Sequence, residues 1–246
     1  MKENKVKFLF HAALVIFALI MLIPFVWMFL TSIKTYEEAI RIPLQMFPKE
    51  IQWVNYEIVY NKFPFLTLYW NTIVVTLVTI AGQLFIVSLA AYAFARLEFP
   101  LKNILFIGML GLMMVPGQIF LIPQFRLMVQ LKLTNTLTAL VLPSLFSVFG
   151  VFLLRQAFQT IPKDLDEAAR MDGCSYFRIY WQIMLPLVTP NLVALGIMTM
   201  LSTWKNLMWP IIVNRSIEKM TLSAGLAMLI GEHTTYYEQV MPVALI

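Results

Sequence analysis

The sequence predicts an all-α membrane protein, folded as a polytopic bundle of transmembrane helices. Of its 246 residues, 60% are hydrophobic and 13% are charged, against about 45–50% and about 25% in soluble domains. A soluble globule of this length could not bury so much apolar surface, so the solvent must be lipid. The apolar residues form continuous runs, not the alternating segments of about ten residues that build a membrane β-barrel. This composition excludes a soluble enzyme, a disordered chain and a disulfide-rich secreted domain.

Five stretches with few charges are long enough to cross a bilayer core of about 30 Å, which takes about 20 helical residues. They cover about residues 8–33, 69–95, 103–125, 137–154 and 185–213. The first is too long for the apolar region of a signal peptide, so we expect it to be retained. A sixth apolar stretch starts at about residue 239, and we expect it to be the truncated start of a sixth span. The prediction is a single transmembrane domain over residues 1–246.

Loop charges set the orientation of such a bundle. The 18 Lys and Arg residues divide almost equally between the two sides. The loops on the side away from the N-terminus are about twice as long, however, so the density of basic residues favours a cytoplasmic N-terminus. Residues 155–184 then form a cytoplasmic loop. We attribute the net charge of +5 to the cytoplasmic face and expect membrane lipid, not nucleic acid, as a partner, because acids are interleaved with the bases.

Groups that carry out catalysis are scarce. His11, His233 and Cys174 are far apart in the sequence and have no metal-ligand spacing, and no glycine begins a P-loop. We therefore expect no catalytic, cofactor-binding or metal site, and an active process would take its energy from another chain. No Asp or Glu lies inside a predicted span, which argues against an ion-coupled secondary transporter.

The loop after the fourth span is rich in charge between residues 161 and 173. Asp164 is suited to cap a helix, and Glu167, three residues later, would complete a capping box. Gly173 fits the left-handed position that ends a helix. The pattern predicts a short helix of about two to three turns.

One side of this short helix would carry Leu165, Ala168, Ala169 and Asp172. The two adjacent alanines would let another protein approach closely, with Asp166, Arg170 and Lys163 as a charged rim. A docking surface for a partner protein is one interpretation, and an ordinary amphipathic connector is the other.

Lys205 is the one charge inside a predicted span, between Trp204 and Asn206. An intramembrane cation is by default a functional hypothesis, so these three residues are candidates for lining a transport path. Lys205 lies near the outer end of its span, however, and could instead extend its ammonium group to the lipid headgroups.

The loop residues resemble a known family. Glu167-Ala168-Ala169 is followed by Gly173, Ile183 and Leu185-Pro186 at the spacing of the EAA motif, which is the signature of membrane subunits of bacterial binding-protein-dependent ABC importers. Four further segments resemble the carbohydrate branch of this family, typified by the second, shorter membrane subunit of the maltose importer: residues 90–100, 115–123, 152–156 and 204–210. In the last segment Lys205 stands where that branch usually has Asn, and Asn206 stands where it has an acid.

The resemblance implies a type I ABC importer permease in the bacterial inner membrane, multi-pass, with a cytoplasmic N-terminus and no ATPase site of its own. It implies a second homologous permease subunit, two ATPase subunits, an extracytoplasmic sugar-binding protein and a sugar or oligosaccharide substrate. The loop 214–238 corresponds to one that can reach into the binding protein. The residues implied to couple to the ATPase are Asp164, Glu167, Ala168, Ala169, Arg170 and Gly173.

Three other functions remain as alternatives. An ABC importer for a non-sugar solute would share the EAA motif but not the carbohydrate-like segments. A secondary transporter would leave the EAA helix without a purpose, and a membrane enzyme would need clusters of His, Cys or acids that the sequence lacks.

Overall fold

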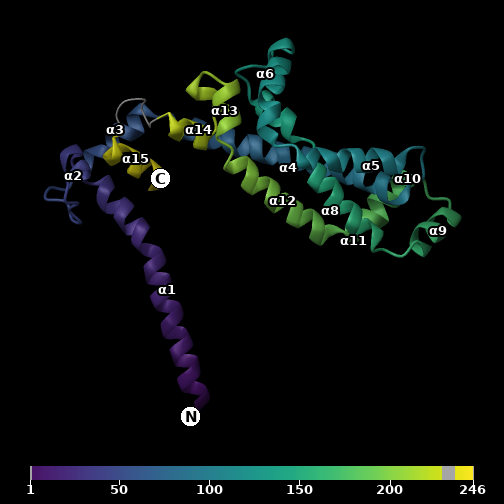
Figure 1. Cartoon of the computed structure of the whole chain (residues 1–246), viewed down its shortest axis with the longest axis horizontal. Coiled ribbons are helices and arrows are strands. Elements are labelled where there is room, and N and C mark those ends of the chain that lie inside the picture. Colours follow the sequence, from purple (N-terminus) through teal and green to yellow (C-terminus); the bar gives the residue numbers. More distant parts are fainter. Residues whose placement is uncertain (1, 229–235, 246) are drawn as a thin grey trace. The chain divides into compact units, whose positions relative to one another are not determined.

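The computed structural model describes residues 2–228 and 236–245, and throughout these residues the regular structure is helical (Figure 1). The predicted all-α fold is confirmed. The chain divides into two compact units, Met1–Phe65 with Gly225–Ile246, and Leu66–Ala224.

The first unit contains the long helix α1 and three short helices. They are α1 (Lys2–Ser32), α2 (Tyr36–Ile40), α3 (Val54–Lys62) and α15 (Tyr237–Leu245). Residues Leu9–Ser32 of α1 are apolar and none of the most apolar window is buried, as expected for a helix surrounded by lipid. Helix α15 packs against α1 and α3. Its residues include position 239, where the sequence predicts the start of a sixth span.

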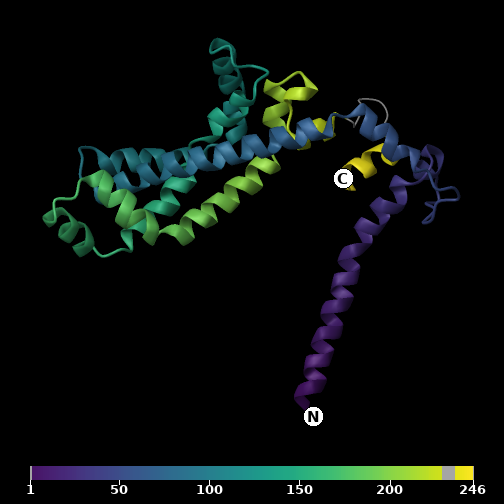
Figure 2. The ribbon, with the colours of Figure 1, turned by 180° about the vertical axis from the view of Figure 1, so that it is seen from behind.

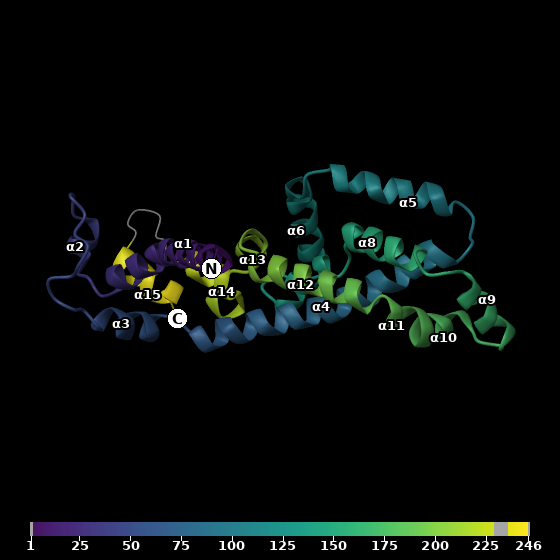
Figure 3. The same cartoon turned by 90° about the horizontal axis from the view of Figure 1, so that it is seen from below.

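The second unit is built on α4 (Phe65–Arg96), which runs through its whole length (Figure 2). The elements that follow are α5 (Lys102–Gly111), η1 (Leu112–Met114), η2 (Gly117–Phe120), α6 (Leu121–Gln130), α7 (Leu137–Val141), η3 (Leu142–Ser144), α8 (Val148–Gln159), α9 (Asp164–Met171), α10 (Tyr176–Arg178), η4 (Ile179–Met184), α11 (Leu185–Leu187), α12 (Thr189–Trp204), α13 (Met208–Val213), η5 (Ile217–Lys219) and α14 (Leu222–Ala227). Helix α8 lies between α5 and α12 in Figure 3 and contacts both.

Only two of the described helices, α1 and α4, are long and apolar enough to cross a membrane unbroken. Three pairs of helical segments could each form one further span that is bent in the middle. They are Lys102–Met114 with Gly117–Gln130 (bent by 98°), Leu137–Ser144 with Val148–Gln159 (45°), and Tyr176–Leu187 with Thr189–Trp204 (79°). Proline occurs at or near each bend, where it removes a backbone donor and disfavours a continuous helix. That each pair crosses the bilayer as one span stays a prediction.

The fifth predicted stretch, 185–213, is not one helix. Helix α12 ends at Trp204, Lys205 is its C-cap residue, and α13 begins only at Met208. Lys205 therefore lies at a helix break as an exposed residue, and not inside a continuous span as the sequence suggested. Pro210 contributes to this break, because its ring excludes it from the interior of a longer helix.

Helices α4, α8 and α12 pack closely around Gly150. A Cβ atom at this position would lie 2.9 Å from Val87 Cγ1 and 3.1 Å from Leu195 Cδ2. Small residues permit such close approach of membrane helices, where packing replaces the hydrophobic effect as the source of association. The surrounding core holds Ala91, Val151, Leu154, Phe158 and Tyr180.

We expect Gly150→Leu to destabilise the protein by about 1–3 kcal/mol, because the added side chain overpacks this contact. The thermal midpoint of the purified protein in detergent measures the effect. Gly108→Leu is the matched control, since Gly108 is also helical and a Cβ atom added there would meet no other atom within 4 Å. Equal midpoints for the two variants would contradict the packing described here.

Candidate functional site

Helix α9 begins without the predicted capping box. Lys163 is the N-cap residue, its backbone is already helical (φ −66°, ψ −25°), and no side chain caps the helix. Asp164 is thus the first helical residue and not the cap, because a cap residue needs an extended backbone. The acids Asp164, Asp166 and Glu167 still lie in the first turn, where the positive end of the helix dipole favours negative charge.

The predicted end of α9 at Gly173 is confirmed. Gly173 has φ +78°, and its N–H donates to the carbonyl of Arg170 at 3.0 Å. The next N–H, of Cys174, donates to the carbonyl of Ala169 at 3.0 Å. This pair of bonds is a Schellman motif, which requires a left-handed residue at the position of Gly173.

The two alanines of the motif lie on different sides of α9. Ala169 is 6% exposed and joins the core of the second unit, while Ala168 is exposed. The prediction that both alanines form one docking face is wrong, because successive helical residues are about 100° apart. The exposed surface instead carries Ala168 with Leu165 and Met171, which are 43% and 87% exposed.

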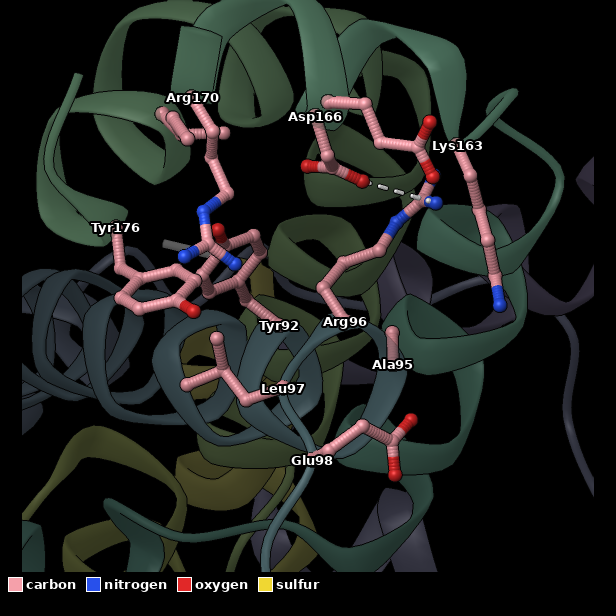
Figure 4. Close-up of a pocket in the computed structure, with 11 residues that line it drawn as sticks. Tyr92, Ala95, Arg96, Leu97, Glu98, Lys163, Asp166, Arg170 and Tyr176 are labelled. Atoms are coloured by element: carbon pink, nitrogen blue, oxygen red, sulfur yellow. Dashed lines mark ion pairs between the residues drawn. The ribbon is translucent and has the colours of Figure 1, made fainter. Parts of the chain in front are cut away.

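The Asp166 side chain lies on the side of α9 that faces the helix bundle, because it pairs with Arg96. It is therefore not part of the charged rim that the sequence predicted. Arg96 Nη1 is 3.1 Å from Asp166 Oδ2, and the arginine side chain is only 5% exposed (Figure 4). Arg96 Nη2 also donates to the carbonyls of Phe158 and Ile161, at 2.6 and 2.5 Å. We call this set of contacts the α9 anchor. It joins the last residue of α4 to α9 and to the end of α8.

A hollow of about 290 Å³ lies under α9. Figure 4 shows Tyr92 and Arg96 extending from α4 toward the residues of α9, and Glu98, just after α4, also lines the hollow. The guanidinium group of Arg170 lies 4.8 Å from the ring centre of Tyr176, which fits a cation–π contact. Glu167 and Lys163 complete the rim, and Asp164 is exposed outside it.

Burial raises the pKa of Asp166, and the neighbouring charge of Glu167 adds to the shift, while Arg96 and Lys163 oppose it. A raised pKa in the folded state means that protonated Asp166 stabilises the fold at low pH, and that this contribution is lost as the pH rises through the raised pKa. Burial and the charge of Arg96 thus act on the Asp166 carboxyl in opposite directions, while the contacts of Arg96 fix the position of α9.

Sequence reasoning missed Arg96 as a site residue. Arg96 is 70 positions before Asp166, and no periodicity connects the two. The available signal was its place in the segment 90–100, as a charge at the end of an otherwise uncharged span.

The structure separates the other three candidates from α9. Trp204, Lys205 and Asn206 lie at the far end of α12, beside α13 (Figure 1). The Trp204 carbonyl accepts a bond from Ser223 Oγ at 2.6 Å, and Asn206 Oδ1 accepts one from the Trp209 N–H at 3.4 Å. Asn206 alone of the three lines a second hollow, of about 330 Å³.

The fold is that of a type I ABC importer permease. The structure matches a chain of a bacterial ABC transporter involved in the import of the acidic polysaccharide alginate, with a TM-score of 0.80 and 23% identity over all of this chain and 92% of that one. Residues 85–246 match the family described as binding-protein-dependent transport system inner membrane component. The chain belongs to this family, and its members are transport components of the inner membrane.

Two groups of relatives extend over almost the whole chain. The arabinooligosaccharides transport system permease protein AraQ of Halalkalibacterium halodurans is 34% identical over 95% of this chain and 82% of its own length. The sn-glycerol-3-phosphate transport system permease protein UgpE of Yersinia enterocolitica is 30% identical over 96% of this chain and 87% of its own length.

We expect Arg96→Leu to destabilise the protein by about 3 kcal/mol, because it leaves the Asp166 carboxylate without its partner. This value is at the lower end of the cost of breaking a buried ion pair, because the Asp166 side chain remains 19% exposed. The double variant Arg96→Leu/Asp166→Leu should be less destabilised than the sum of the two single variants. Thermal midpoints of the four proteins measure the coupling, and strict additivity would show that the pair does not hold α9.

Proposed function

We propose that this chain is the membrane-spanning subunit of an ATP-driven importer of sugars or oligosaccharides, and that α9 is its docking helix for an ATPase subunit. The observation that carries the proposal is the construction of α9, which presents an exposed side to a partner while its other side is fixed to α4 and α8 by the α9 anchor. Family membership and the EAA motif support the same assignment.

The complex would contain a second homologous permease subunit, two ATPase subunits and an extracytoplasmic sugar-binding protein. The chain itself would hydrolyse no ATP, since its sequence holds no P-loop. The loop 214–238 would contact the binding protein, although its residues 229–235 lie outside the described part of the chain. The protein would lie in the bacterial inner membrane with its N-terminus in the cytoplasm.

Coupling follows from the contacts of α9. When the ATPase subunits close on ATP, they would displace the exposed side of α9, which includes Glu167, Ala168 and Arg170. Arg96 would transmit this displacement to α4, and Ala169 would transmit it to the packed core of α4, α8 and α12. Such rigid-body movement is a common way for domain closure to reach a distant site.

The relatives support a sugar or a related polyol as the substrate. One group is named for the transport of arabinooligosaccharides and the other for the transport of sn-glycerol-3-phosphate. A neutral oligosaccharide and a phosphorylated polyol share hydroxyl groups but differ in charge, so the two candidates can be separated experimentally.

Gly173→Val should abolish most transport, because a β-branched residue is strained at φ +78° and would disrupt the end of α9. Gly173→Asn is the matched control, since Asn tolerates the left-handed region better. Uptake of labelled sugar by cells, normalised to the amount of protein in the membrane, measures both. Normal uptake by the Gly173→Val variant would count against docking through α9.

The orientation is tested by labelling single cysteines in intact cells, in a Cys174→Ser background. Met171→Cys is expected to react with a membrane-impermeant maleimide only after the cells are opened, because α9 should be cytoplasmic. Trp53→Cys, at a residue that is 60% exposed, should react in intact cells. Labelling of Met171→Cys from outside would reverse the proposed topology.

A further inference from the structure

Three interruptions of helical structure meet at the second hollow, of about 330 Å³. Gly117 and Gln118 begin η2, directly after the bend that follows η1, Ser144 ends η3, and Asn206 lies in the break between α12 and α13. Helices α6 and α13 lie side by side here (Figure 1). We call this space the polar hollow, because its lining includes the polar residues Gln118, Gln124, Ser144 and Asn206.

Two hydrogen bonds of Gln83 connect the polar hollow with the middle of α4. Gln83 Nε2 donates to the carbonyl of Ser144 at 2.8 Å, and Gln83 Oε1 accepts a bond from Thr199 of α12. Gln83 is about 20 Å along α4 from Arg96, at 1.5 Å per residue. The predicted second span, 69–95, puts Arg96 at the membrane boundary, and a bilayer core is about 30 Å thick. On that prediction Gln83 and the residues bonded to it would lie inside the core.

Polar side chains at this depth need a partner other than lipid. Irregular backbone within a membrane occurs where it is buried in protein or lines a water-filled cavity. Gln118 is exposed, and Gln124, Ser144 and Asn206 are partly exposed. A solute path satisfies these groups, whereas contact with lipid would leave their amides and hydroxyl without hydrogen bonds.

The chemistry of the lining selects a class of solute. Each amide of Gln118, Gln124 and Asn206 offers both a donor and an acceptor, which matches the hydroxyl groups of a saccharide. All the residues that line the hollow are uncharged, whereas phosphate groups are usually bound by Arg or Lys. The lining therefore fits a neutral polyol better than an anionic one.

We propose that the polar hollow is this chain's part of the translocation path and that it contacts the hydroxyl groups of a neutral saccharide through Gln118, Gln124 and Asn206. The inference rests on the proposed function and deepens it. It also divides the three candidates from the sequence: Asn206 lines the path, whereas Trp204 and Lys205 do not.

The test uses the complete importer, purified with its partner chains and reconstituted in vesicles. Uptake of labelled arabinotriose, maltotriose and sn-glycerol 3-phosphate is measured together with ATP hydrolysis. The variant is Gln118→Leu/Gln124→Leu. The matched control is Gln130→Leu, which makes the same change on α6 at an exposed residue that does not line the hollow.

We expect the double variant to import the saccharide about tenfold more slowly than the control, because it removes two hydrogen-bonding side chains from the path. ATP hydrolysis should remain within about twofold of the unaltered importer, since α9 is untouched. The unaltered importer should take up a saccharide in preference to sn-glycerol 3-phosphate.

Three outcomes would overturn the inference while leaving the ATP-driven importer intact. Equal saccharide uptake by the double variant and the Gln130→Leu control would remove these side chains from the path. An equal fall in uptake and ATP hydrolysis would make the hollow a contact with the partner permease. Preferred import of sn-glycerol 3-phosphate would contradict the neutral assignment. An unaltered complex that contains no ATPase would instead overturn the proposed function itself, and this inference with it.

Discussion

Arg96 joins three helices at one end of the second unit. Its guanidinium group binds the Asp166 carboxylate of α9, the carbonyl of Phe158 near the end of α8 and that of Ile161 just after α8, while its backbone ends α4. Without this contact α9 would be attached to the bundle by little more than Ala169 and the chain connections on either side. A helix that a partner displaces can transmit the displacement only if it is rigidly attached to the rest of the fold. The proposed coupling therefore depends on the α9 anchor.

The membrane imposes the second constraint. Backbone groups without hydrogen bonds are costly in lipid, so breaks in transmembrane helices must be covered by protein or open onto water. The bends near Pro116-Gly117 and Pro143, and the break at Lys205, occur where the polar hollow forms. Gln83 satisfies part of this region from α4 by bonding both η3 and α12. The breaks are thus the feature that lets an apolar bundle contain a polar site.

Helix α4 connects the α9 anchor with Ser144, which lines the polar hollow. Helix α4 contributes Arg96 to the α9 anchor, and its Gln83 bonds Ser144. Helix α12 contributes Thr199, which bonds Gln83, and Leu195, which packs beside Gly150. A displacement of α9 would therefore act on α4, whose Gln83 is hydrogen-bonded to Ser144 at the edge of the hollow. This continuity of packed helices gives a physical connection between the proposed ATPase-docking helix and the proposed solute path, of the kind that can couple distant sites.

The sequence alone was sufficient for the all-α membrane class, for the EAA motif and for the end of α9 at Gly173. These features depend on composition and on local backbone conformation, which residues close in sequence determine. It was misleading for the capping box, for the shared face of Ala168 and Ala169, and for the continuity of the stretch around Lys205. Only the tertiary structure brought Arg96 to Asp166 and Gln83 to Ser144 and Thr199. Those contacts depend on how helices distant in sequence pack together, and no local pattern in the sequence encodes which partners meet.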